Sequence, residues 1–161
     1  MNGFASIDTD FLIGKIRQFN EEHRQYLPEL AQLAGKIEAV HAKHPDVPKG
    51  LAGCLQLLAD DLETHTKMEE AALFPAMRQG QISAAAPPVS KFRNNRDDHE
   101  RLLSHLEVVT DHFTAPSDGC RSWTSLYDSL EVFSIKLRAQ IRLENEIVFP
   151  QLSDRGDTSK K

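Results

Sequence analysis

The sequence has no long apolar run, only two cysteines and no cluster of positive charge. No stretch approaches the roughly 20 apolar residues of a membrane-spanning helix, which argues against a membrane protein. Asp and Glu number 24 against 19 Lys and Arg, giving a net charge of −5. Because no run of Lys or Arg is present either, nucleic acid and anionic membranes are poor candidates for partners.

The scarcity of cysteine also bears on the cellular compartment. Cys54 and Cys120 do not form a CxxC pair and can make one disulfide at most. The first ten residues lack the basic start and apolar stretch of a secretory signal. We therefore expect a cytoplasmic protein with reduced thiols. At 161 residues, the chain is long enough for one domain with a substantial core.

Gly and Pro divide the chain into four segments whose apolar residues recur every three to four positions, which is typical of amphipathic helices. Helices are predicted over residues 9–42, 51–77, 91–113 and 122–152. Pro28 removes one hydrogen bond from the first of them and predicts a kink. The fold class is therefore predicted to be all-α, an up-down-up-down four-helix bundle over residues 9–152, with an N-terminal extension (1–8) and a mobile polar tail (153–161).

One motif occurs twice, as HTKMEEAALFP at residues 65–75 and as QIRLENEIVFP at residues 140–150. In each copy the apolar stripe of the helix continues into two polar residues, His65 and Glu69 in the first and Gln140 and Glu144 in the second. A spacing of four places both side chains on one face of a helix, one turn apart. The repeat therefore predicts two equivalent polar positions on two inward faces.

The other two helices also carry polar residues on their inward faces. Asn20 and His23 lie on the stripe of the first helix, and His99 lies on that of the third. Burying unpaired carboxylates costs several kcal/mol each, and a bound cation offsets this cost. A lone histidine on an apolar face is more often a hydrogen-bonded core residue, but carboxylates and imidazoles converging from several helices favour a metal site.

Five stretches, EEHRQYLPEL, HTKMEEAALFP, DDHERLL, CRSWTSLYDSL and ENEIVFP, resemble the hemerythrin-like domain in this order. The likeness is greater to the repair-of-iron-centres family of di-iron proteins and covers about residues 11–152. It implies a four-helix bundle and two irons bridged by an oxo group and two glutamates, with two histidines on each iron. Longer members carry an N-terminal cysteine-containing domain, which we expect this chain to lack.

The resemblance also implies which residues bind metal. Carried over by motif, the implied ligands are His65, Glu69, His99 and Glu144. The remaining two histidine positions fall on Asn20 and Gln140, whose amide oxygens are weak ligands.

Three outcomes are compatible with these replacements. His23 could substitute for Asn20, since it lies on nearly the same face about 4.5 Å along the helix. The site could instead hold a single metal, or internal hydrogen bonds and water could close it. The expected metal is iron, in a di-iron or mononuclear site, although zinc and manganese suit the same ligands.

The resemblance implies a non-haem iron protein of the nitrosative or oxidative stress response, with a binding or repair role rather than catalytic turnover. Expected partners are nitric oxide, oxygen and iron–sulfur proteins that accept iron. One alternative is a module that binds or senses oxygen or nitric oxide reversibly. Another is a degenerate paralogue with an incomplete or empty site and an interaction role.

Other polar residues are predicted to lie outside the site. Asp61 and Asp98 could orient the site histidines from behind, or could be solvated surface acids. His41 and His44 are expected at the end of the first helix, and His105 and His112 at the surface or between helices.

Overall fold

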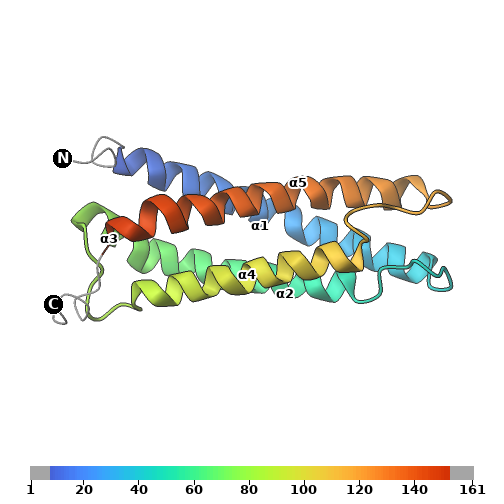
Figure 1. The fold of residues 1–161 in the computed structure, drawn as a ribbon, viewed down its shortest axis with the longest axis horizontal. Coiled ribbons are helices and arrows are strands. Elements are labelled where there is room, and N and C mark those ends of the chain that lie inside the picture. The colour runs from blue at the N-terminus through green and yellow to red at the C-terminus, as the bar shows by residue number, and fades with distance from the viewer. Residues whose placement is uncertain (1–7, 153–161) are drawn as a thin grey trace.

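Four long helices lie side by side with alternating direction in the computed structural model, which describes residues 8–152 (Figure 1). They are α1 (Thr9–Val40), α2 (Leu51–Met68), α4 (Val89–Val109) and α5 (Arg121–Leu143). The helix α1 packs against α2 and α5, and α2 also packs against α4. Over the described residues, the predicted all-α bundle is confirmed. The predicted tail, and all but one residue of the predicted extension, lie outside the described range.

The ends of the helices follow local chemistry. The carboxylate of Asp8 accepts a hydrogen bond from the Asp10 N–H at 3.0 Å and caps the start of α1. Pro28 lies within α1 without ending it. The helix α4 ends at Val109, four residues before the predicted end, because residues 111–113 have φ angles of 51°, 55° and 61°. These left-handed values are unfavourable for residues with a side chain and cannot continue a right-handed helix.

Both copies of the repeated motif widen the helix at the glutamate. A π-helical turn, η2 (Glu69–Leu73), follows α2 and leads into α3 (Phe74–Gln79). In η2 the Phe74 N–H donates to the carbonyl of Glu69, five residues earlier. Pro75 has no N–H to donate, and in a regular helix its ring would clash with the carbonyl four residues earlier. The wider turn accommodates the proline while the helix continues.

The second copy has the same geometry. The turn η3 (Glu144–Val148) follows α5 and leads into the short 3-10 helix η4 (Phe149–Gln151). The Phe149 N–H donates to the carbonyl of Glu144. Glu69 and Glu144 are therefore each the first residue of a π-helical turn.

The core consists of two apolar clusters with a polar layer between them. The larger cluster fills the half of the bundle around Trp123, and the smaller one surrounds Phe92 and Phe149 at the other end. Buried polar residues from α1, from α4 and from the two copies of the motif lie between the two clusters. These residues form the polar layer: Asn20, His23, His65, Glu69, Arg96, His99, Gln140 and Glu144.

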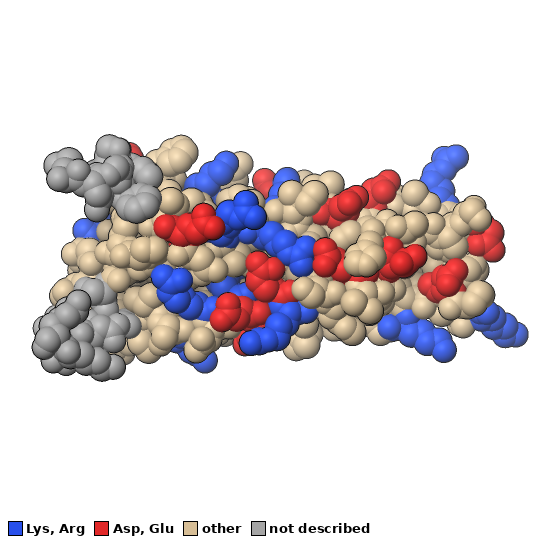
Figure 2. Space-filling view, in the orientation of Figure 1, with Lys and Arg blue, Asp and Glu red and all other residues tan. Residues whose placement is uncertain are grey.

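The surface is mixed in charge. On the face shown in Figure 2, Lys and Arg are interspersed with Asp and Glu along the length of the bundle. Ion pairs between helices on the surface include Arg17 with Glu70 and Lys136 with Glu22. None of the helices between residues 8 and 152 is both long and apolar enough to span a bilayer.

A candidate metal centre

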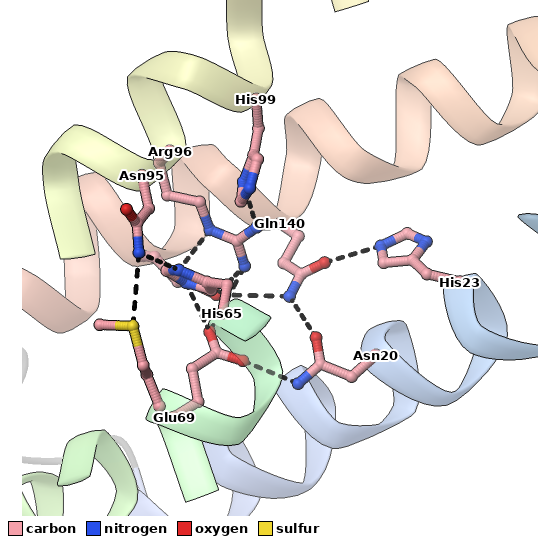
Figure 3. A network of polar contacts seen from close by, with 10 residues as sticks. Asn20, His23, His65, Glu69, Asn95, Arg96, His99 and Gln140 are labelled. Carbon is pink, nitrogen blue, oxygen red and sulfur yellow. Dashed lines mark hydrogen bonds and ion pairs between the residues drawn. The ribbon is translucent and has the colours of Figure 1, made fainter. Parts of the chain in front are cut away.

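The polar layer brings together every residue that the sequence predicted for the site (Figure 3). The helix α1 contributes Asn20 and His23, and α4 contributes His99. The other four come from the two copies of the motif: His65, Glu69, Gln140 and Glu144. All seven side chains are buried, with exposed fractions of 8% or less.

Three of these side chains form a compact set of metal donors. One donor atom each from His65, Glu69 and Glu144 lies within 4.8 Å of the other two. The His65 Nε2 lies 3.2 Å from Glu69 Oε2 and 3.6 Å from Glu144 Oε1. This Nε2 is buried and makes no hydrogen bond. An imidazole nitrogen that makes no hydrogen bond but lies within ion-pair distance of two carboxylates is an arrangement suited to one divalent cation.

Arg96 is the member of the layer that the sequence analysis missed. Its guanidinium is 1% exposed and lies against both glutamates. Nε donates to Glu144 Oε1 at 2.8 Å and Nη2 to Glu144 Oε2 at 2.7 Å, a bidentate pair. The same Nη2 lies 3.4 Å from Glu69 Oε2. A fixed positive charge is therefore already present beside the two carboxylates.

His99 lies on the same side of the layer as this guanidinium. Its Nδ1 is 3.2 Å from Arg96 Nη1, and its ring centroid is 5.4 Å from that of His65. Burial and the Arg96 charge lower the pKa of His99 to about 3, so the imidazole is neutral. Because the arginine can only donate, Nδ1 accepts this hydrogen bond.

Two amides stand at the positions where the resemblance implies histidines, and they bind one another. Gln140 Nε2 donates to Asn20 Oδ1 at 2.9 Å and lies 3.3 Å from Glu144 Oε2. Asn20 Nδ2 donates to Glu69 Oε1 at 2.8 Å. Each amide thus holds one carboxylate by hydrogen bonding.

His23 lies at the edge of the layer rather than among the donors. Its Nε2 is 2.9 Å from Gln140 Oε1, and its ring meets Phe133 edge-on with centroids 5.2 Å apart. Burial is the main cause that lowers its pKa to about 4. It contacts the amide network, whereas the three-donor set lies deeper in the layer.

The two glutamates differ in charge state although their positions in the motif are equivalent. Burial and the neighbouring Glu144 charge raise the pKa of Glu69 to about 7. Burial acts in the same direction on Glu144, but the charge and hydrogen bonds of Arg96 outweigh it and hold the pKa of Glu144 below its ordinary value. Burial and the Arg96 charge lower the pKa of His65, but its contacts with the two glutamates outweigh them, and the net shift is upward.

A pocket of about 190 Å³ lies beside the layer, between α1 and α2. Its lining includes Asn20, His23 and Thr66. The exposed fraction of Asn20 is 8%, whereas that of Glu69 is 0%. The layer is therefore closest to solvent on the side of Asn20.

The remaining polar predictions fall away from the layer. His41 caps the end of α1 and lies 3.3 Å from the sulfur of Cys120. His44 contacts Asp118, near the same end of the bundle. Asp98 forms an ion pair with the exposed Arg101 rather than with a site histidine. The contact behind His65 comes instead from Asn95, whose Nδ2 is 3.2 Å from Nδ1 of the ring.

One group of three donors in the layer, His65, Glu69 and Glu144, could hold a metal ion. An imidazole and two carboxylates are a suitable set for one iron, zinc or manganese ion. On the His99 side, the guanidinium takes both oxygens of Glu144 and the Nδ1 lone pair of His99. Arg96 therefore already binds Nδ1 of His99 and one lone pair on each Glu144 oxygen, while Glu144 Oε1 still lies 3.6 Å from His65 Nε2.

Carboxylates and imidazoles converging inside four antiparallel helices define the class of cation-binding helical bundles. The chain belongs to the hemerythrin family, because residues 12–152 match the family described as the Hemerythrin HHE cation binding domain. This confirms the predicted resemblance. Family membership and the donor set together support non-haem iron as the cofactor.

Curated relatives share a repair function. The chain is 40% identical over 134 residues to the iron-sulfur cluster repair protein YtfE of Cronobacter sakazakii, covering 83% of this chain and 61% of that protein. It is 38% identical over 136 residues to the protein of the same name from Musicola paradisiaca, covering 84% and 61%. The chain therefore spans less than two thirds of the length of these relatives.

Proposed function

We propose that this protein binds one non-haem iron at His65, Glu69 and Glu144 and acts in the repair of iron–sulfur clusters under nitrosative or oxidative stress. The observation that carries the proposal is the convergence of His65 Nε2, which makes no hydrogen bond, with two buried carboxylates at 3.2 and 3.6 Å. The identity to iron-sulfur cluster repair proteins supports the assignment to repair. The proposed location is the cytoplasm, and the proposed partners are iron–sulfur proteins that accept iron.

Iron bound at this position would supply coordination sites that are open to exchange, because only three protein side chains hold it. The protein's part is to bind and position the ion. Asn20 and Gln140 fix the two carboxylates through hydrogen bonds. If the side-chain amide of Asn95 is flipped, so that its oxygen and nitrogen exchange places, the oxygen accepts a hydrogen bond from His65 Nδ1–H. The lone pair of His65 Nε2 would then be available to iron. Weak ligation favours release of the ion, as delivery to a damaged cluster requires.

Metal binding is tested by loading the purified protein with Fe(II) under anaerobic conditions and measuring iron per chain. Repair is tested by restoring the activity of an iron–sulfur enzyme damaged by nitric oxide. We expect His65→Ala to lose both properties, because it removes the imidazole donor. The matched control is His105→Ala, which removes an exposed histidine from α4 and should retain both. Wild-type protein that gains no iron would contradict the proposal.

A second candidate function is reversible binding of nitric oxide or oxygen for sensing. The pocket lined by Asn20, His23 and Thr66 favours it, because a diatomic molecule could approach the layer from that side. An absorption spectrum that changes with gas and returns on its removal, without cluster repair, would select this function over the first.

A further inference from the structure

We propose that Arg96 replaces the second metal ion of the centre, so that this protein holds one metal beside a permanent organic cation. The inference rests on the proposed function, since it concerns how many ions the same layer accepts. It identifies Arg96 as the residue that sets metal stoichiometry.

The guanidinium occupies a cation position by its contacts. It touches both glutamates and the imidazole of His99, the same side chains that the resemblance implies for metal ligation. Its bidentate pair with Glu144 has donor–acceptor distances of 2.8 and 2.7 Å. Arginine is charged at all physiological pH values and forms a rigid, planar fork of donors that matches a carboxylate. It therefore neutralises the buried carboxylates without any metal.

All four carboxylate oxygens have a protein donor within 3.5 Å. Asn20 reaches Glu69 Oε1, and Arg96 lies 3.4 Å from Glu69 Oε2. Arg96 also donates to both oxygens of Glu144, and Gln140 lies 3.3 Å from its Oε2. A pair of bridging carboxylates that lacked metal would leave oxygens without partners. Here internal hydrogen bonds close the layer on the side of Arg96.

The two imidazoles of the layer differ in their contacts. Nε2 of His65 makes no hydrogen bond and lies 3.2 and 3.6 Å from the two glutamates, whereas Nδ1 of His99 is bound to Arg96. One imidazole therefore remains available for a metal, and the other serves the guanidinium. The replacements at positions 20 and 140 agree with this asymmetry, because amides suit a layer that needs fewer metal donors.

Arg96 is held at this position by the fold. It lies three residues before His99 on α4, so both side chains project from one face of the helix. It is 1% exposed, and a guanidinium that left the carboxylates would remain buried without a counter-charge. Binding of a second ion would require that displacement, which is why we expect it not to occur.

The test compares wild type with Arg96→Ala by anaerobic Fe(II) titration, with metal analysis after removal of free iron. We expect about one iron per chain in wild type and more than one in Arg96→Ala. The matched control is Arg138→Ala, which removes a partly exposed arginine paired with Glu100 and Glu107. It should leave the stoichiometry unchanged.

Thermal unfolding of the metal-stripped proteins gives a readout that is independent of iron loading. Without its guanidinium, the layer has two buried carboxylates and no fixed cation, so Tm should fall by roughly 6–20 °C relative to wild type. Added Zn(II) should restore most of the loss in Arg96→Ala and should raise the wild-type Tm less.

The outcomes separate this inference from the proposed function. Two irons in wild type would overturn the role of Arg96 and leave iron binding intact, and this measurement does not depend on the variant folding. One iron in both proteins would also overturn the role of Arg96. Iron in Arg96→Ala alone would overturn the proposed function and support exclusion by the guanidinium. Iron in neither protein would refute both.

Discussion

Replacement of Glu144 by glutamine should destabilise the metal-free protein far more than the same replacement of Glu69. Glu144 accepts the two short hydrogen bonds of Arg96, and its pKa is held below the ordinary value by that charge. In Glu144→Gln the guanidinium stays buried beside a neutral amide. Loss of one partner of a buried ion pair costs about 3–5 kcal/mol, which for a chain of this size lowers Tm by about 6–20 °C.

Glu69→Gln should cost much less at pH 7. Burial and the Glu144 charge raise the pKa of Glu69 to about 7, so part of the population already carries a neutral carboxyl group near this pH. Its longer contact with Arg96, at 3.4 Å, contributes little. A glutamine keeps an oxygen that can accept the hydrogen bond from Asn20, and the expected loss is within about 1 kcal/mol.

The comparison requires differential scanning calorimetry of both variants and wild type after removal of metal, in one buffer at pH 7. Far-ultraviolet circular dichroism would verify that all three proteins are helical before unfolding. Equal losses of Tm in the two variants, or a larger loss in Glu69→Gln, would refute the asymmetry that we assign to Arg96.

Three further outcomes are expected. Asn20→His with Gln140→His should leave iron near one per chain in titrations, whereas adding Arg96→Ala to this pair should bring it near two; equal values would contradict the block by the guanidinium. Leu58→Ala, in the larger apolar cluster, should lower the free energy of unfolding by about 2–5 kcal/mol in urea melts, with iron content unchanged. The pKa of His23 is lowered to about 4 in the folded protein, so as pH falls the imidazole is protonated in the unfolded chain before it is protonated in the folded one, and metal-free protein should lose stability between about pH 6.5 and 4. His23→Phe should lose less stability over this range. Equal pH dependence of Tm in the variant and wild type would contradict the assignment.

The helices and most of the polar layer could be predicted because they depend on periodic burial. His65, Glu69, Gln140 and Glu144 continue the apolar stripes of their helices, and a polar residue on such a stripe must face the interior. The widened turns could not be predicted in this way, because inserting one residue into a helical turn hardly alters the pattern. The end of α4 could not be predicted either, because none of the three left-handed residues that follow it is a glycine.

Arg96 was missed for a chemical reason rather than a geometrical one. The buried residues Phe92, Arg96, His99, Leu103 and Leu106 are spaced by four and three, so the stripe of α4 includes the arginine. Arginine is a cation and is not considered in a search for metal donors, and the bidentate partner of Arg96, Glu144, follows another helix. Only the three-dimensional structure shows that the guanidinium of Arg96 pairs with the carboxylate of Glu144.

The polar layer also fixes the vertical alignment of the bundle. Leucine-rich layers can slide past one another with modest loss, since any apolar neighbour substitutes for another. The guanidinium, carboxylate and amide groups of the polar layer pair with one another in one alignment of the helices only. A shift of one helix by a turn would leave several buried charges without their partners. We therefore expect the polar layer to determine the axial alignment of the four helices during folding, also in the absence of metal.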